Sequence, residues 1–256
     1  MKGKEQIYLI SVVTNLVQYE ALIENNPFLR GCTLIKYENT RANIPIPVHF
    51  NHFLENKMPK DAWLVLCHQD FEFLESPQAL FAQLDKNVIY GPIGVQTTTR
   101  KTWSIKFGGK SFIKTHRGKD IYPLFYGQIK QGVPEKEKLI GRKITRPHLV
   151  DTVDACCQIV HSSLIRKYNL RFDPAFDFHL YCEDFSLAAR QYGISTYAVQ
   201  INCRHISPGH ANRLFWDKYT ILLKKYPKEF FVTTCAGVKQ YIHQSLALRW
   251  PLFSQK

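Results

Sequence analysis

The stretch "WLVLCHQDFEF", residues 63–73, places residues of the metal-ligand type directly after a run of apolar side chains. Five apolar residues end at Cys67, and His68, Asp70 and Glu72 follow at alternate positions. Imidazole nitrogens and carboxylate oxygens bind divalent cations, and Mg²⁺ or Mn²⁺ needs only one or two protein ligands when phosphate groups supply others. The apolar run predicts a buried strand, so we expect these side chains just beyond its carboxyl end.

Two further groups of candidate residues lie in the second half of the chain. One is acid-rich and includes Asp154, Glu183 and Asp184, and the other is "CRHISPGH", with His205 and His210. Each group also has an ordinary structural explanation, because acids favour turns and helix starts and a histidine can lie satisfied in a core. The order of the groups along the chain is therefore more informative than any one of them.

The first half alternates strand-like and helix-like segments. Expected strands are 7–14, 32–39, 62–67 and 87–95, and expected helices follow Gln18 and lie at 45–56 and 76–85. This alternation is typical of an α/β sheet, in which ligands bind beyond the carboxyl ends of the strands. His68 to Glu72 fall at such a position.

The rest of the chain is less regular. "TWSIKFGG" is interpreted as a hairpin strand and 129–143, "IKQGVPEKEKLIGRK", as a mobile loop. We then expect two strand pieces in 148–162, a short helix at "SLIRKYNL", a helix ending near Gly193, and one strand at 195–207. A basic amphipathic helix, "ANRLFWDKYTILLKKYP", follows. There is no internal repeat and no Gly-rich phosphate-binding motif.

In this order, the three groups resemble the GT-A glycosyltransferases of the family 2 type, and in particular a bacterial branch with HQD in place of DxD. The matching pieces are "LCHQDFEF", 150–193 and "CRHISPGH", within a likeness that covers roughly residues 5–215. The resemblance implies an α/β GT-A (nucleotide-diphospho-sugar transferase) fold, with a mostly parallel central sheet flanked by helices. The implied division is a GT-A domain at 1–215, with a nucleotide-binding half (1–95) and an acceptor or catalytic half (148–210), and a basic helical C-terminal extension at 216–256.

The resemblance also implies a nucleotide-sugar donor and a Mn²⁺ or Mg²⁺ ion. Asp70 matches a metal ligand, and His205 matches a histidine that binds metal or diphosphate. His68 replaces the usual first Asp, where it lines the donor pocket or favours Mn²⁺ over Mg²⁺. Asp154 matches a position that contacts the donor sugar. The residues expected around the nucleoside, at the ends of the first two strands, are Thr14, Asn15, Glu38 and Asn39.

For the chemical step, the acceptor hydroxyl must lose a proton to a carboxylate within reach. Asp184 matches the second residue of the family's "ED" pair, which is the base in inverting members, and Glu183 is expected to shape the pocket. The implied function is transfer of a sugar to a glycan or glycolipid hydroxyl in bacterial surface polysaccharide or lipooligosaccharide synthesis, with inversion.

Two other functions are consistent with parts of the sequence. A sugar nucleotidyltransferase would share the fold, but its first loop is Gly- and Arg-rich, and "TNLVQYEAL" contains neither residue. A basic nucleic-acid-binding module would explain the net charge of +13, but no RNP-like aromatic signature or zinc spacing is present. We therefore expect no specific nucleic acid as partner.

The charge and the cysteines bear on location. The seven cysteines include no CxxC pair, which favours a reducing compartment. No apolar stretch approaches the ~20 residues of a spanning helix. The C-terminal segment mixes cations with tryptophans, and such segments bind anionic lipid. The residues concerned are Trp216, Lys218, Lys224, Lys225, Lys228, Lys239, Arg249 and Trp250. The expected location is cytoplasmic, with peripheral attachment to the inner face of the cell membrane.

Overall fold

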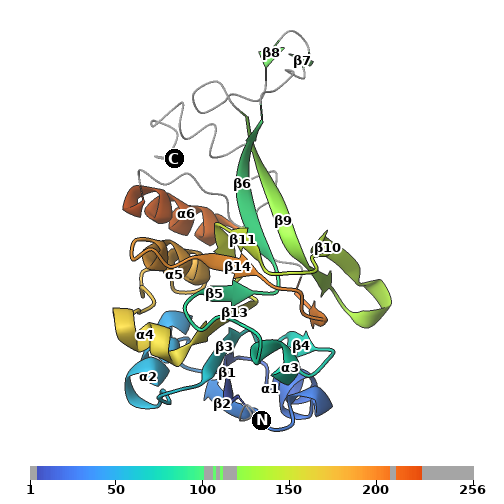
Figure 1. The fold of residues 1–256 in the computed structure, drawn as a ribbon, viewed down its shortest axis with the longest axis vertical. Helices are drawn as coiled ribbons and strands as arrows, with labels where there is room; N and C mark the ends of the chain where they lie inside the picture. The colour runs from blue at the N-terminus through green and yellow to red at the C-terminus, as the bar shows by residue number, and fades with distance from the viewer. Residues whose placement is uncertain (1–4, 101–105, 108–109, 112–119, 208–211, 227–256) are drawn as a thin grey trace.

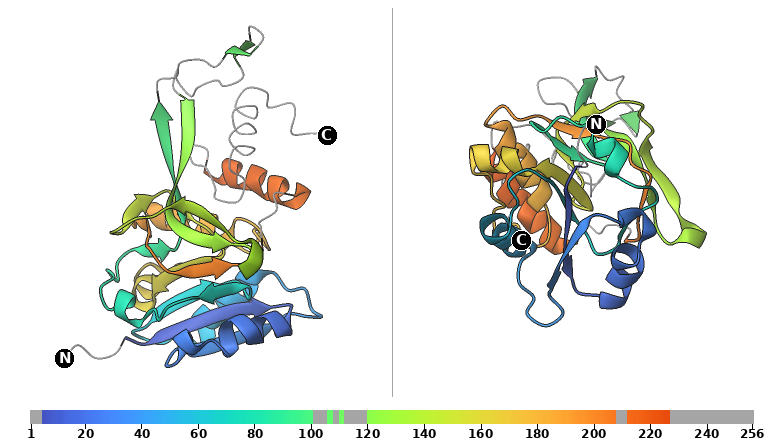
Figure 2. Two further views of the ribbon diagram at one scale, coloured as in Figure 1. Left: turned by 90° about the vertical axis from the view of Figure 1, so that its right-hand side faces the viewer. Right: turned by 60° about the horizontal axis from the view of Figure 1, so that its bottom comes forward.

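The computed structural model describes residues 5–100, 106–107, 110–111, 120–207 and 212–226. In these residues two β-sheets lie together, with helices packed against them (Figure 1, Figure 2). A small separate pair, β7 (Lys106–Phe107) and β8 (Lys110–Ser111), lies beyond the far end of the second sheet. Strand β7 falls in the predicted "TWSIKFGG" segment and β8 follows it directly, whereas the rest of that segment is outside the described residues.

The larger sheet has seven strands in the order β11-β14-β5-β13-β3-β1-β2. Their bounds are β1 Ile7–Val13, β2 Thr33–Glu38, β3 Trp63–Cys67, β5 Ile89–Gly91, β11 His148–Val150, β13 Cys157–His161 and β14 Thr196–Ala198. β1 is parallel to β2 and β3, and β14 is parallel to β5, whereas β13 and β11 are antiparallel to their neighbours. Five strands thus run one way and two the other, which confirms the expected mostly parallel sheet.

Strand β3 lies inside the larger sheet, and all of its residues are buried. Its alternate side chains face opposite sides of the sheet, as strand geometry requires. Leu64 and Leu66 belong to one apolar core, and Trp63 and Val65 belong to the other. A strand covered on both faces is apolar throughout, so polar residues begin only where the strand ends.

Helices cover both faces of this sheet. The helices of the first core are α2 Ile46–Asn56, α4 Ser162–Tyr168, α5 Tyr181–Arg190 and α6 Arg213–Lys225. On the second core lie α1 Leu16–Tyr19, a π-helical turn at Glu20–Glu24 and α3 Gln78–Phe81. Short 3-10 turns occur at Pro27–Leu29 and Pro134–Lys136. The helix expected at 76–85 is therefore reduced to the single short α3.

The second sheet packs on the face of the larger sheet that carries the second core. This second sheet was not predicted. Its order is β12-β6-β9-β15-β4, with β10 paired to β9. The bounds are β4 Phe71–Phe73, β6 Gly94–Arg100, β9 Asp120–Gln131, β10 Lys138–Arg142, β12 Thr152–Val153 and β15 Cys203–His205. The second sheet contributes buried side chains to the second core, among them Phe71, Phe73, Ile129 and Cys203. The long β6–β9 ribbon rises well above the helical layer (Figure 1).

The interpretation of 129–143 as a mobile loop was wrong. These residues form the end of β9, a 3-10 turn and β10, with Lys138 opposite Gln131 and Ile140 opposite Ile129. Gly132 and Gly141 have φ of 108° and 87°. Their left-handed backbone permits the turn and the bulge of an antiparallel ribbon, so the glycines that suggested a loop are what allow the hairpin.

Other expected strands are divided more finely than the sequence indicated. Residues 87–95 give β5 and β6, and 195–207 give β14 and β15, with the two members of each pair in different sheets. Pro92 lies between β5 and β6, and a proline cannot donate to a ladder. Residues 148–162 hold three strands, β11, β12 and β13, where two pieces were expected.

The basic helix predicted near the C-terminus is α6. Phe215, Tyr219 and Leu222 are buried in the first core, so the helix packs on the sheet domain. The predicted boundary between 215 and 216 falls inside α6, and the division into domains stays a prediction. None of the helices in the described residues has the length and apolar character needed to span a bilayer.

Candidate functional site

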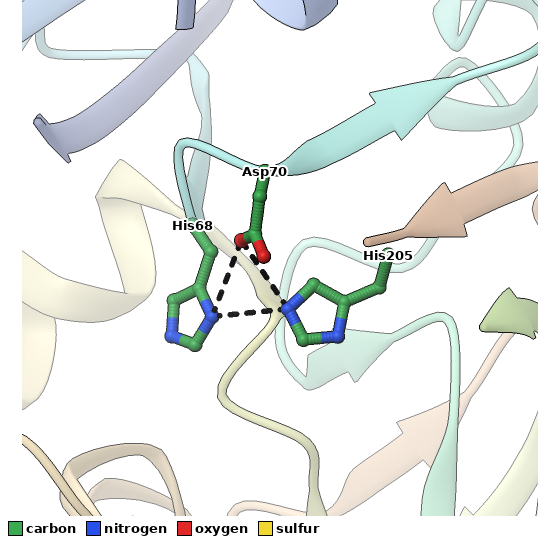
Figure 3. Close-up of side chains that lie close together, drawn as sticks. All are labelled: His68, Asp70 and His205. Carbon is green, nitrogen blue, oxygen red and sulfur yellow. Dashed lines mark hydrogen bonds and ion pairs between the residues drawn. The ribbon is translucent and has the colours of Figure 1, made fainter. Parts of the chain in front are cut away.

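His68, Asp70 and His205 converge on one point at the edge of the two sheets (Figure 3). Asp70 Oδ1 lies 3.3 Å from His205 Nε2 and 3.9 Å from His68 Nδ1, and the two imidazole nitrogens are 3.3 Å apart. In the described part of the chain, no other group of three or more metal-binding side chains comes so close together. The structure thus joins His205 to His68 and Asp70, which the sequence placed in a separate group.

Strand pairing positions this cluster. His68 to Asp70 form the turn between β3 and β4, and β4 pairs antiparallel with β15 so that Phe71 lies opposite His205. The Ile206 N–H donates to the Asp70 carbonyl at 3.1 Å. The His68 N–H donates to the Cys156 carbonyl at 3.0 Å, which ties the turn to the loop before β13. The two ends of the sequence motif are therefore fixed by backbone hydrogen bonds.

The electrostatics favour an ionised Asp70 carboxylate beside a neutral His68 and a His205 whose pKa is raised. Burial raises the pKa of Asp70, but His205, His68 and Ser207 together outweigh it and hold that pKa well below its usual range. Burial lowers the pKa of His205, but Asp70 more than compensates and raises it. Burial and the nearby His205 lower the pKa of His68 to about 4, so His68 is neutral at pH 7.

The donor set fits a divalent cation. Asp70 Oδ2 is engaged by the N–H and hydroxyl of Ser207, which leaves Oδ1 facing the two imidazoles. His68 is the most open of the three, with 27% of its side chain exposed, so the cluster is accessible from its side. Two nitrogens and one oxygen suit Mn²⁺ better than Mg²⁺, which prefers an all-oxygen environment.

Tyr181 is part of this site and was missed from the sequence. Its hydroxyl lies 2.8 Å from His68 Nε2 and 3.4 Å from the Ala155 carbonyl. A carbonyl only accepts, so the hydroxyl donates to Ala155 and accepts from a proton on His68 Nε2. That tautomer leaves the lone pair of His68 on Nδ1, the nitrogen that faces Asp70. Tyr181 lies two residues before the "ED" pair, but nothing in the sequence links it to His68.

Gln69, the middle residue of the HQD motif, was also missed. Its Oε1 accepts from the backbone N–H groups of Thr14 and Asn15, at 2.7 and 2.8 Å. These two residues follow β1, so Gln69 fastens the end of β1 to the turn that carries His68 and Asp70. The residues predicted to lie near the nucleoside are thereby held beside the candidate metal ligands.

Glu38 and Asn39 lie at the end of β2, next to the end of β1. Val13 is opposite Glu38, and the Asn39 N–H donates to the Val13 carbonyl at 2.7 Å. The Asn39 side chain is buried. It donates to the backbone carbonyl of Ile44 and accepts from the backbone N–H of Ile44, which closes the loop between them. Glu38 accepts from the Thr40 hydroxyl at 3.1 Å. The adjacency of these residues is established, and their role in nucleoside binding stays a prediction.

Asp154 lies in the loop between β12 and β13, on the same side as the cluster. Its Oδ1 accepts from the Cys156 N–H at 2.9 Å. Its charge acts on His68, His205 and Glu183, and in each of them burial is the larger influence on the pKa. Asp154 is therefore a close electrostatic neighbour of the candidate metal ligands.

The two acids of the "ED" pair have different surroundings. Glu183 is fully buried, and neither carboxyl oxygen has a hydrogen-bond partner among the described residues. Burial, with the charge of Asp154, raises its pKa to about 8. Asp184 is 1% exposed, and its Oδ1 lies 2.8 Å from Lys225 Nζ and 2.9 Å from the donating Tyr226 hydroxyl. Burial raises the pKa of Asp184, against the opposing effects of Lys225 and Tyr226. The end of α6 therefore covers Asp184.

The described residues thus define a mixed α/β protein with a His-Asp-His cluster at the carboxyl end of a central strand. No protein-family model and no curated protein sequence matches the chain. Among solved structures, GalNAc-T7 with UDP, GalNAc and Mn²⁺ aligns with a TM-score of 0.51 and 9% identity, covering 96% of this chain and 55% of that one. S. aureus TarS 1-349 aligns with a TM-score of 0.45 and 10% identity, covering 94% of this chain and 69% of that one.

The alignment with GalNAc-T7 shows that the chain has the GT-A fold, as the sequence predicted. At 9% identity the alignment establishes the fold alone. This chain spans about half the length of the GalNAc-T7 chain, 55% of it. The activity must therefore be argued from the site.

Proposed function

We propose that the protein is a metal-dependent glycosyltransferase that moves a sugar from a nucleotide-diphosphate donor to an acceptor hydroxyl. The observation that supports this most directly is the convergence of His68, Asp70 and His205 beyond the carboxyl end of β3 in a GT-A fold. Ligands of open α/β sheets bind at that edge. A His-Asp-His donor set there is suited to hold a cation beside a diphosphate.

In this proposal His68, Asp70 and His205 hold Mn²⁺ or Mg²⁺, with Mn²⁺ favoured by the two imidazoles. When bound, the cation would neutralise charge that develops on the departing nucleoside diphosphate. The ends of β1 and β2 bind the nucleoside through Thr14, Asn15, Glu38 and Asn39. Asp154, next to the cluster, contacts the donor sugar.

The base of the reaction is Asp184, and the product has an inverted anomeric centre. Glu183 is a poor base at pH 7, since its pKa of about 8 keeps it mostly protonated. Asp184 is covered by Lys225 and Tyr226, so acceptor binding requires the end of α6 to move away. Glu183 then serves as an uncharged wall of the pocket.

The acceptor is a glycan or glycolipid, and the product contributes to bacterial surface polysaccharide or lipooligosaccharide. The enzyme acts in the cytoplasm, at the inner face of the cell membrane. These points rest on the resemblance of the sequence pattern and on the basic composition of the chain. No specific nucleic acid is a partner.

The test measures release of the nucleoside diphosphate from UDP-, GDP- and dTDP-sugars, with and without Mn²⁺. Wild-type protein should release diphosphate only with metal, and Asp70→Asn should abolish release while keeping its melting temperature. Asp85→Asn is a matched control, because Asp85 also accepts a backbone N–H but lies outside the cluster. Activity that survives chelation, or wild-type turnover in Asp70→Asn, would overturn the proposal. Formation of a nucleotide-sugar from a nucleoside triphosphate would instead identify a nucleotidyltransferase.

A further inference from the structure

The hairpin formed by residues 131–143, from the end of β9 through β10, projects from the edge of the second sheet (Figure 1). It exposes aliphatic side chains that a solvated ribbon does not need. Leu139 is 64% exposed, Val133 43% and Ile140 37%. Single exposed aliphatic residues are common on protein surfaces. Leu139 and Ile140 are adjacent on β10 and point to opposite faces of the ribbon, so the hairpin exposes apolar groups on both faces near its tip. This marks the tip as a candidate interaction surface.

The same hairpin carries cations with no acidic partner in the described residues. They are Lys136, Lys138, Arg142 and Lys143, all exposed. Its two acids are Glu135 and Glu137, and Glu137 is already paired with Lys130 at 3.1 Å and with Arg204 at 2.8 Å. The hairpin therefore presents unpaired positive charge beside exposed aliphatic groups.

We propose that this hairpin binds the surface of an anionic lipid bilayer. Aliphatic side chains enter the interface between headgroups and acyl chains, and the cations attract the anionic headgroups. An edge strand that only needs protection from strand pairing would carry lysines without exposed leucine and isoleucine. Nucleic acid would engage the cations but not Leu139 or Ile140.

The base of the hairpin is joined directly to the candidate metal site. The Gly132 N–H donates to the His205 carbonyl at 2.9 Å, and the Gln131 amide lies 3.4 Å from His205 Nδ1. Arg204, the neighbour of His205 on β15, pairs with Glu137 on the hairpin and Glu72 on β4. If the proposed transferase activity holds, docking would bring the active site to the level of the headgroups, where a lipid-linked acceptor is presented.

The experiment is sedimentation of the full chain with vesicles of phosphatidylcholine, alone or mixed with phosphatidylglycerol, at low and high salt. Two variants remove one component each. The aliphatic variant is Leu139→Ser with Ile140→Ser, and the charge variant is Lys136→Gln, Lys138→Gln, Arg142→Gln and Lys143→Gln. Matched controls alter exposed residues elsewhere: Val17→Ser with Phe28→Ser, and Arg30→Gln, Arg41→Gln, Lys57→Gln and Lys60→Gln.

Wild-type protein and both controls should bind the anionic vesicles at low salt and lose binding at high salt, where charge is screened. Each cation removed from the hairpin should weaken partitioning by about fivefold. The aliphatic variant should weaken binding to the anionic vesicles at low salt, because the apolar contact with the bilayer is lost. Wild-type binding by both hairpin variants would overturn the proposal and assign any membrane affinity to another segment. If the charge variant loses affinity for RNA but binds the anionic vesicles as wild type does, the proposal is also overturned. Neither result depends on transferase activity.

Discussion

The hydroxyl of Tyr181 lies 2.8 Å from Nε2 of His68 and donates to the Ala155 carbonyl, so it accepts the Nε2 proton and leaves the lone pair of His68 on Nδ1, the nitrogen that faces Asp70. Tyr181 is fully buried at the start of α5, so it is a rigid partner. Outer partners of metal-binding histidines fix their tautomer and ring orientation. Tyr181 is therefore a positioning residue for the proposed metal site.

Tyr181→Phe should weaken Mn²⁺ binding by about 10- to 100-fold, because His68 loses the contact that fixes its tautomer. Isothermal titration calorimetry with Mn²⁺ and no substrate measures this directly. Tyr37→Phe is the matched control, since the Tyr37 hydroxyl also contacts a histidine, His52 at 3.1 Å, away from the cluster. Equal Mn²⁺ affinity in wild-type protein and Tyr181→Phe would contradict the assigned role.

Gln69→Leu should weaken nucleotide binding and leave Mn²⁺ binding nearly unchanged. The substitution removes the hydrogen bonds to the Thr14 and Asn15 N–H groups, each worth about 1 kcal/mol. Both N–H groups are near solvent, so a loss of roughly 5- to 30-fold in affinity for the nucleoside diphosphate is expected.

Fluorescence titration with UDP, GDP and dTDP, alongside Mn²⁺ titration, checks this separation. The control is Gln83→Leu, which removes an exposed amide that donates to the Ala79 carbonyl. If Gln69→Leu lowers Mn²⁺ and nucleotide affinity by the same factor, Gln69 supports the turn and does not act through the end of β1.

His68 and Asp70 could be predicted as candidate metal ligands because the local sequence pattern indicates their position. A continuous apolar run predicts a doubly covered strand, and His68 and Asp70 begin where that run ends. The partners of these residues were not predictable, since they depend on register between distant strands. Only the pairing of β4 with β15 places His205 at Asp70, and only the approach of α5 places Tyr181 at His68. The second sheet was missed for a related reason, because β4, β12 and β15 are only two or three residues long and β9 contains Pro123 and Gly127.

Glu183→Gln should flatten the pH dependence of stability. The carboxyl has a pKa of about 8 in the fold and near 4.5 in the unfolded chain. The folded state thus binds the proton more tightly, so this contribution to stability is full below about pH 4.5 and is lost as pH rises to about 8. The slope is roughly 1.4 kcal/mol per pH unit at most, and the uncharged glutamine has none.

Chemical denaturation of wild-type protein and Glu183→Gln at a series of pH values measures this difference. The variant should gain stability relative to wild type as pH rises, because the neutral side chain avoids an unpaired buried charge. Glu20→Gln serves as control, since Glu20 is exposed in the π-helical turn. Parallel curves for wild type and Glu183→Gln would show that Glu183 is ionised in the fold.

Asp184→Asn should lower turnover and Lys225→Met should not, although both break the same 2.8 Å ion pair. Loss of a general base lowers turnover by about 10²- to 10⁴-fold, so Asp184→Asn should fall in that range in folded protein. Lys225→Met should keep or raise turnover, because it releases the end of α6 from the carboxylate, and should cost about 1–3 kcal/mol of stability, less than a fully buried pair because Lys225 is 35% exposed. Lys224→Met, at the exposed neighbouring position, is the control.

Turnover, melting temperature and the anomeric configuration by NMR are measured for each. If both substitutions lower turnover and stability together, Asp184 only anchors α6, and a retained configuration would exclude single displacement.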